Sequence, residues 1–425
     1  MTAKATSIAK TYLDALADEL EISDTRYEQA QESYRSLGRW FNRPASTLRG
    51  YDPAVYVQGS FGLGTVIKPL HAEEEYDVDA VCELKALNKS QLSQETLKAM
   101  VGAEMEGYRR SQAMTKPLRE GRRCWTLNYA DGAQFHMDVV PALPNARDVR
   151  ILLDSKGLDA SRAATAIAIT DNERLGYQQI SDDWPRSNPK GYLDWFKGRM
   201  RVVLEKRRRA MADAVKASVE AIPDYKVRTP LQSSIMILKR HRDIMYVKDE
   251  LNCCPISIII TTLAAHAYQG EEEIADALLS ILSGMEAYIA RDTRGRAVIA
   301  NPSDPLENFA DKWAEFPERE RAFYAWLRQA QRDFAHAASL ADRHSITDSL
   351  SPHLGQELAK RAADRSASKP AGLLRGATAP PPVRCRPQAL ATPRARRPSR
   401  KALRDLVDRS AVPRPRRTAG DRRAG

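Results

Sequence analysis

The sequence predicts an α+β fold of two lobes, a mixed sheet with helices followed by a helical lobe, and then a basic tail. Short stretches with strand character occur in the first third of the chain, at residues 55–60, 76–84, 124–130 and 134–141. From about residue 194 the apolar positions follow helical spacing instead. After about residue 366 Pro and Arg dominate, a composition that cannot bury a core.

Helices are expected before and between the strands of the first lobe. Residues 7–42 carry apolar and aromatic side chains at helical spacing, with a break near Ser23 and Asp24, where either residue, followed by Glu28, suits the start of a second helix. A further helix is predicted at about 90–113, between the second and third strands. Asp131-Gly132, between the last two strands, is typical of a hairpin turn. This mixture of strands and helices predicts a mixed sheet with helices on one side.

The second half is predicted to be helical and to form a domain of its own. Long helical patterns occupy residues 192–221, 229–247, 255–268, 271–290 and 317–343. We therefore expect a first lobe at 1–190, with the helices of 7–42 packing on it or spanning both lobes, and a helical domain at 191–345. Residues 366–425 are expected to be disordered or foreign to the native protein.

The positive charge of the chain is concentrated in its tail. The 425 residues carry a formal net charge of +11, of which residues 366–425 contribute +13, so that the first 365 residues have a net charge of −2. Phosphate contacts with a long nucleic acid require a basic surface, and the near-neutral lobes give no strong indication of one. The tail itself fits a phosphate-binding arm, a disordered linker or sequence outside the native frame.

Cysteine usage and hydropathy indicate a soluble cytoplasmic protein. The five cysteines have no framework spacing in so long a chain, which favours a reducing compartment. The N-terminal residues do not resemble a signal peptide, and the most apolar run, at 255–268, is shorter than the ~20 residues that span a bilayer. No membrane association is therefore expected.

The most informative motif is EYDVDAV, which places Asp77 and Asp79 on one face of a strand because side chains alternate along it. Two adjacent carboxylates repel each other and persist most easily around a cation, and oxygen ligands favour Mg²⁺ or Mn²⁺. Asp138, in the apolar strand HMDVVP, is a third candidate ligand. Three such acids on neighbouring strands suit a two-metal site that activates a hydroxyl and stabilises a leaving phosphate.

A glycine-rich segment precedes this strand. Gly59 and Ser60 end the first predicted strand in a turn whose backbone N–H groups and hydroxyl can face phosphate oxygens. Phosphate binding beside a carboxylate metal site suits nucleotidyl transfer, in which a hydroxyl attacks the α-phosphate of a nucleoside triphosphate and pyrophosphate leaves.

The segments GSFGLGT, EYDVDAV and HMDVV together resemble the polymerase-β-like nucleotidyltransferases. Three further segments resemble the bacterial cyclic-oligonucleotide synthases of the cyclic GMP-AMP synthase and DncV-like (CD-NTase) group: RSNPKGYLDWF at 186–196, PLQSSIMILKRHRDIMY at 230–246 and NPSDPLENFADKW at 301–313. The resemblance covers roughly residues 10–340. The tail has no recognised counterpart.

This resemblance implies roles for individual residues. It implies that Asp77 and Asp79 ligate two Mg²⁺ or Mn²⁺ ions, and that Asp138 completes one site and helps to deprotonate the acceptor hydroxyl. Gly59 and Ser60 would hold the donor triphosphate, preceded by Gln58, whose role in nucleotide binding is left open. Lys239 matches a lysine that contacts the triphosphate in relatives, and Arg240 beside it is the alternative.

The implied activity is the joining of nucleoside triphosphates, at least one of them ATP, into a cyclic di- or trinucleotide second messenger of antiphage (CBASS) defence. The resemblance alone suggests regulatory partners, a ubiquitin-like ligase or HORMA-type proteins. Two alternatives remain: transfer of nucleotides to an RNA or protein acceptor, and nucleotide sensing without turnover. No zinc is expected, because Cys253-Cys254, considered with His241 and His266, lacks zinc-site spacing and is more typical of buried cysteines.

Overall fold

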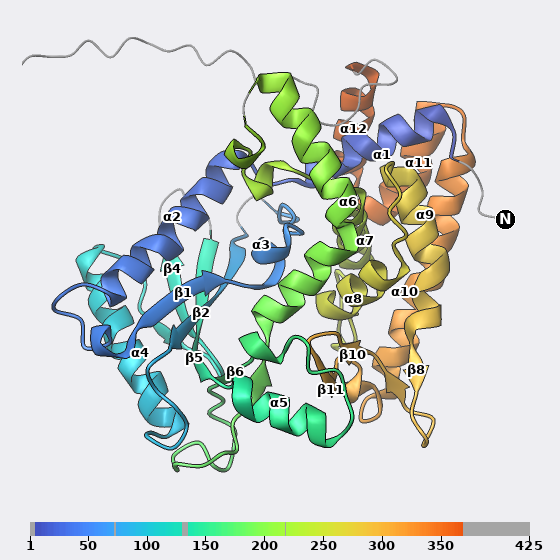
Figure 1. The fold of residues 1–425 in the computed structure, drawn as a ribbon. Coiled ribbons are helices and arrows are strands. Elements are labelled where there is room, and N and C mark those ends of the chain that lie inside the picture. The colour runs from blue at the N-terminus through green and yellow to red at the C-terminus, as the bar shows by residue number, and fades with distance from the viewer. Residues whose placement is uncertain (1–4, 72–73, 130–134, 217, 369–425) are drawn as a thin grey trace, which may run out of the picture. The chain divides into compact units, whose positions relative to one another are not determined.

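A computed structural model describes residues 5–71, 74–129, 135–216 and 218–368 (Figure 1). Within these residues one mixed sheet has the strand order β1-β2-β5-β4-β3, and β6 and β7 extend it from the end of β5. The strands are β1 (Pro53–Val57), β2 (Tyr76–Leu84), β3 (Arg119–Glu120), β4 (Trp125–Tyr129), β5 (Phe135–Pro144), β6 (Ile167–Ile169) and β7 (Arg186–Ser187). The central pair, β2 and β5, is parallel, whereas β1 and β4 pair antiparallel to their neighbours.

One face of the sheet is covered by helices α2 (Asp24–Phe41) and α4 (Gln94–Ser111). Val78, Ala80 and Cys82 point into this core and are fully buried, because alternate residues of β2 share a face. The residues between them therefore project from the opposite face. The hydrophobic pattern of one strand thus decides which way its two aspartates point.

A second hydrophobic cluster is helical. It combines α1 (Ser7–Leu20) with helices from the second half of the chain. Those helices are α6 (Pro189–Val215), α7 (Pro230–Met245), α8 (Ser257–Ala267), α9 (Ile274–Gly284), α10 (Pro317–Ser339), α11 (Arg343–Leu354) and α12 (Gln356–Ser368). The first helix thus packs among helices from the other end of the chain, beside α12 in particular (Figure 1). None of the helices that the structure describes is both long and apolar enough to cross a membrane.

The predicted α+β class is confirmed, with differences in detail. The glycine-rich segment forms a short helix, α3 (Gly59–Leu63), and α5 (Ala146–Ser155) was not predicted. Helix continues past residue 345, and the first three residues assigned to the tail end α12, where Ser366 is buried. These residues are helical because α12 has an apolar face that packs against α1 and α11.

Short hairpins interrupt the half that was predicted to be helical. They are formed by β8 (Ala290–Arg291) with β9 (Ala297–Val298) and by β10 (Ala300–Asn301) with β11 (Asp304–Asn308). The Asp131-Gly132 turn and the tail from residue 369 lie outside the described residues. The described residues pack as one unit, and the domain boundary near residue 190 stays a prediction.

An ion-pair cluster around one buried aspartate joins the segment that precedes β4 to the end of β6. The Asp171 side chain is fully buried and accepts hydrogen bonds from Arg122 at 2.7 and 2.8 Å and from Arg123 at 3.0 Å. Despite the burial, these bonds and the N–H of Glu173 hold the pKa of Asp171 down at about 2. The carboxylate is therefore charged in the folded protein and contributes to its stability.

Candidate active site

The pairing of β2 with β5 brings the predicted carboxylates together. Asp79 lies directly opposite Asp138, and Asp77 lies opposite His136, in the parallel register of the two strands. Neighbouring strands are about 4.8 Å apart, and residues two apart on one strand share a face. Asp77, Asp79 and Asp138 therefore project side by side from the face of the sheet that α2 and α4 leave uncovered.

The three carboxylates differ in their surroundings. The Asp77 side chain is 71% exposed, whereas Asp79 and Asp138 are only partly accessible. Burial, together with the nearby charges of Asp77 and Asp138, raises the pKa of Asp79 to about 6. The donor set consists of carboxylate oxygens that repel each other, and a divalent cation among them would relieve this repulsion. The residues present thus fit Mg²⁺ or Mn²⁺.

Two neighbouring side chains orient the carboxylates of Asp138 and Asp77. The Thr126 hydroxyl donates to Asp138 Oδ1 at 2.6 Å, from the antiparallel neighbour strand β4. His136 Nε2 lies 2.7 Å from Asp77 Oδ1, and this hydrogen bond raises the pKa of His136. One oxygen of each carboxylate is therefore held by a protein group, and the positions of both carboxylates are restricted.

The glycine-rich helix α3 begins in contact with Asp79. The Gln58 N–H donates to the Asp79 carbonyl at 2.8 Å, which fixes the start of α3 beside β2. Gly59 then adopts a φ of +59°, and a Cβ atom at this position would lie 2.1 Å from Asp79 Oδ2. Only glycine fits, for conformational and for steric reasons. The backbone N–H groups of Gly59 and Ser60, at the start of α3, have no acceptor within the helix.

Helix α7 holds the end of α3 and the segment that follows it. Three of its side chains donate to backbone carbonyls there: Gln232 to Leu63 at 2.9 Å, Lys239 to Thr65 at 3.1 Å, and Arg240 to Lys68. The start of α7 is itself fixed by a reciprocal capping box between Thr229 and Gln232. The helical part of the protein thus positions the glycine-rich segment relative to the carboxylates.

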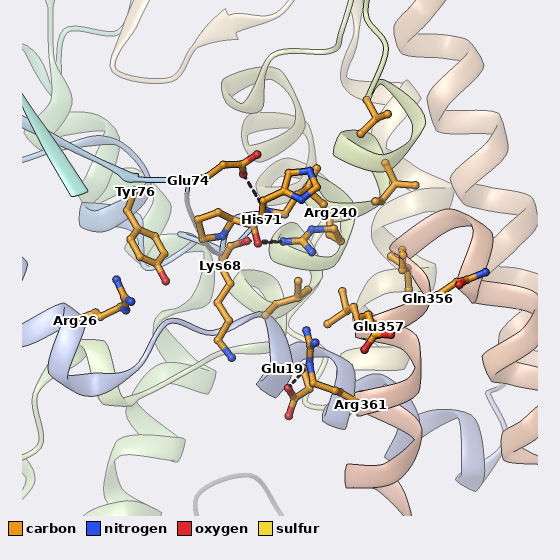
Figure 2. A pocket seen from close by; sticks show the side chains of 18 residues that line it. Glu19, Arg26, Lys68, His71, Glu74, Tyr76, Arg240, Gln356, Glu357 and Arg361 are labelled. Carbon is orange, nitrogen blue, oxygen red and sulfur yellow. Dashed lines mark hydrogen bonds and ion pairs between the residues drawn. The ribbon is translucent and has the colours of Figure 1, made fainter. Parts of the chain in front are cut away.

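Lys239 and Arg240 are adjacent in sequence but lie in different surroundings. Lys239 is buried, which lowers its pKa to about 8, and its charge is close enough to Asp79 to lower the pKa of that residue in turn. Arg240 instead lines a pocket of about 760 Å³ together with Tyr76 (Figure 2). Because Tyr76 precedes Asp77 on β2, the two side chains project from opposite faces of the strand. The structure therefore places Lys239, and not Arg240, near the carboxylates.

Sequence reasoning missed two polar residues of this region, Thr126 and Thr65. Thr65 is fully buried, and both its carbonyl and its hydroxyl accept from Lys239, the hydroxyl at 3.3 Å. Thr126 is opposite Asp138. A two-residue turn at Asp131-Gly132 would have paired Thr126 with Met137, so the local turn signal does not reveal this contact. Neither threonine carries a motif that would have identified it.

The part of the chain that holds this site matches a known family. Residues 53–141, which include β1 through most of β5, match the family described as cyclic GMP-AMP synthase DncV-like, nucleotidyltransferase domain. A c-di-GMP synthase from Roseivirga ehrenbergii is 28% identical over 338 residues, which are 77% of this chain and 80% of the relative. The cyclic dinucleotide synthase CdnG from Bradyrhizobium diazoefficiens is 27% identical over 320 residues, 71% of this chain and 70% of the relative.

The fold is shared with solved structures. The structure of Bradyrhizobium diazoefficiens CdnG in complex with GTP superposes with a TM-score of 0.63, at 22% identity, over 84% of this chain and 98% of that one. At this identity the likeness shows a common fold.

Proposed function

Because the chain is a member of the CD-NTase group, nucleotidyltransferases that form cyclic products, we propose that it joins two nucleoside triphosphates into a cyclic dinucleotide at the carboxylates of β2 and β5. The observation that carries this proposal is the register that sets Asp79 opposite Asp138, with Gly59 in contact with the Asp79 carboxylate. Carboxylates and a glycine-rich helix start are thereby combined within one small region.

In this proposal Asp77, Asp79 and Asp138 hold two Mg²⁺ or Mn²⁺ ions. The ions, when bound, lower the pKa of the attacking hydroxyl and neutralise charge on the leaving pyrophosphate. Asp138 Oδ2 can accept the proton of that hydroxyl, because Thr126 already occupies Oδ1. The N–H groups of Gly59 and Ser60 bind triphosphate oxygens. Two such transfers in succession, the second within one linear intermediate, close a ring.

We propose GTP as one of the substrates. The two curated relatives are named a c-di-GMP synthase and a cyclic dinucleotide synthase, and the solved CdnG structure contains GTP. ATP, expected from the sequence resemblance, is the second candidate. A product of this kind would act as a second messenger in antiphage defence, and ubiquitin-like ligase or HORMA-type proteins are the regulatory partners to be sought.

The proposal is tested by incubating the full chain with each single nucleoside triphosphate and each pair, in the presence of Mg²⁺ or Mn²⁺. We expect a phosphatase-resistant product whose mass equals that of two nucleotides joined in a ring. The Asp79→Asn variant, which keeps the size of the side chain but loses its charge, should make none. Failure of the wild-type protein to exceed this variant under all conditions would refute the proposal.

The same incubations, together with calorimetry, separate the alternative functions. Label that stays attached to RNA or protein would show transfer to a macromolecular acceptor. A linear, phosphatase-sensitive product would show chain extension without cyclisation. Calorimetric binding of a nucleotide with no turnover would show a sensor.

A further inference from the structure

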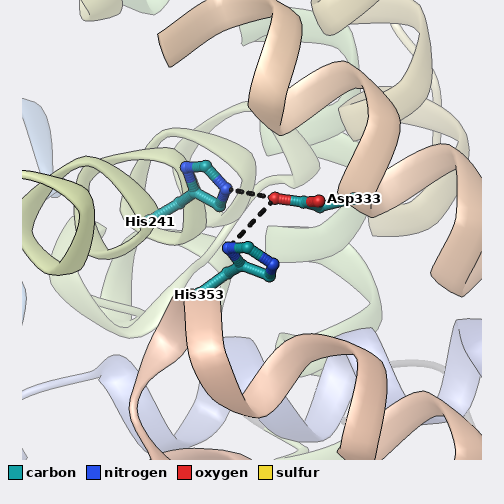
Figure 3. Close-up of side chains that lie close together, drawn as sticks. All are labelled: His241, Asp333 and His353. Atoms are coloured by element: carbon teal, nitrogen blue, oxygen red, sulfur yellow. Dashed lines mark hydrogen bonds and ion pairs between the residues drawn. The ribbon is translucent and has the colours of Figure 1, made fainter.

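Three helices meet at a histidine–aspartate–histidine cluster in the helical part of the protein, where Asp333 of α10 lies between His241 of α7 and His353 of α11 (Figure 3). His241 Nε2 is 3.0 Å and His353 Nδ1 is 3.3 Å from the same carboxylate oxygen, Asp333 Oδ2. All three atoms lie within 4.8 Å of one another. These side chains belong to elements far apart in the sequence and converge only in the folded protein.

The spacing of these atoms suits a tetrahedral metal ion. Zinc binds imidazole nitrogen and carboxylate oxygen at about 2.0–2.2 Å, which places adjacent ligand atoms of a tetrahedron about 3.3 Å apart. The distances from Asp333 Oδ2 to the two imidazole nitrogens, 3.0 and 3.3 Å, are close to this value. Two imidazoles and one carboxylate are a common ligand set for Zn²⁺ and related divalent transition metals. A fourth position can be taken by water.

The surroundings of the cluster orient its ligands. Gln329 Nε2 donates to Asp333 Oδ1 at 2.7 Å, which turns the other oxygen, Oδ2, toward the two imidazoles. Outer hydrogen bonds of this kind orient carboxylates in metal sites. The side chain of His241 is only 1% exposed, and its Nδ1 has no hydrogen-bond partner among the described residues. Hydrogen bonds within the protein therefore compensate only part of the desolvation of this imidazole. His353 is 32% exposed and provides a path for an ion from solvent.

We propose that His241, Asp333 and His353 bind a divalent transition-metal ion, with Zn²⁺ the preferred occupant. This site is separate from the carboxylates of β2 and β5 and has a different donor chemistry. It also differs from the cysteine-based site considered from the sequence. Cys253 and Cys254 instead donate their backbone N–H groups to the Asp249 carboxylate, and neither belongs to the cluster.

A metal ion at this position would tie α7 to α10 and α11. His241 follows Lys239 and Arg240, the residues of α7 that hold the segment after α3. The ion would therefore brace the helix that positions the glycine-rich segment, from its other side. Its role is structural, because the cluster does not contact the carboxylates that we assign to catalysis.

The test uses the full chain with Asp77→Ala and Asp79→Ala, so that Zn²⁺ does not bind at the catalytic carboxylates. After chelator treatment and dialysis, Zn²⁺ is titrated by calorimetry, and Co²⁺ is added separately to record the visible absorption of a tetrahedral site. We expect one Zn²⁺ per chain and a rise in Tm on loading. His353→Ala should weaken the affinity at least tenfold, the lower end of what the loss of even an outer-shell partner costs.

The matched control is His344→Ala, since His344 lies on the same helix, α11, but its side chain is 89% exposed and it pairs with Asp348, outside the cluster. This variant should bind Zn²⁺ like its parent. If His353→Ala fails to fold, as judged by circular dichroism, Asp333→Asn takes its place. The proposal is overturned if the parent chain binds no stoichiometric Zn²⁺, or if loss of either ligand leaves the affinity within threefold of the control.

Discussion

The contact between Gly59 and Asp79 predicts that a single methyl group abolishes most of the activity. In Gly59→Ala the new Cβ would lie 2.1 Å from Asp79 Oδ2, whereas real Cβ contacts are essentially never shorter than 3.0 Å. The carboxylate or the start of α3 must therefore move by about 1 Å. Misplacement of a catalytic group by about 1 Å can lower a rate about 10²-fold, which corresponds to about 2.7 kcal/mol in the activation barrier.

The effect on folding should be much smaller than the effect on activity. A φ of +59° costs an L-residue about 1–2 kcal/mol relative to glycine. A domain with a typical stability of about 5–15 kcal/mol remains folded after this loss, and Tm should fall by only a few degrees. A hundredfold loss of product formation in a variant that still folds would thus show that the substitution has disturbed the geometry of the active site.

Gly62→Ala is the matched control, because it places the same methyl group in the same short helix. Its Cβ would lie 3.6 Å from the Val57 carbonyl oxygen and 4.0 Å from Leu193 Cδ2, which are ordinary contacts, and Gly62 has no positive φ. Initial rates of pyrophosphate release at saturating Mg²⁺ and circular dichroism melting curves would be measured for both variants. If Gly59→Ala retained more than a third of the wild-type kcat/KM, or if Gly62→Ala lost as much activity, the assigned role of this contact would be wrong.

Three further predictions concern buried polar groups. Lys239→Met should lower kcat/KM about tenfold or more, since a charge-assisted hydrogen bond, here from the ammonium to the donor triphosphate, is worth about 1.5–3 kcal/mol. Unchanged steady-state kinetics would show that Lys239 does not contact the substrate. Asp171→Asn should lower the free energy of unfolding at pH 7 by about 2 kcal/mol, measured in urea. The folded-state pKa of Asp171 is depressed to about 2 from 3.8. The difference in unfolding free energy between wild type and variant should therefore be complete above about pH 4 and decrease as the pH falls toward 2. Burial raises the pKa of the Cys82 thiol, so a maleimide should label Cys82 only after denaturation, as peptide mass spectrometry would show.

Local patterns in the sequence predicted much of the first lobe. The strand at residues 76–84 was predicted with its observed bounds, because alternating apolar side chains mark a half-buried strand regardless of its partners. The helices at residues 343–354 and 356–368 were missed. The first of them, α11, has only a weak apolar periodicity and contains Pro352. Its helical state depends on packing against α10, α12 and α7. The residue-by-residue roles of the carboxylates stay predictions until the variants are measured.

Strand periodicity alone determines that Asp77 and Asp79 share a face, since it depends only on the geometry of one extended segment. The register that sets Asp138 opposite Asp79 is a long-range pairing, and a shift by one residue would have turned Asp138 to the other face. The different surroundings of Lys239 and Arg240, and the meeting of His241, Asp333 and His353, likewise arise from helix packing. Distances between segments far apart in the chain are set by how their apolar faces pack together, and no local pattern contains that information.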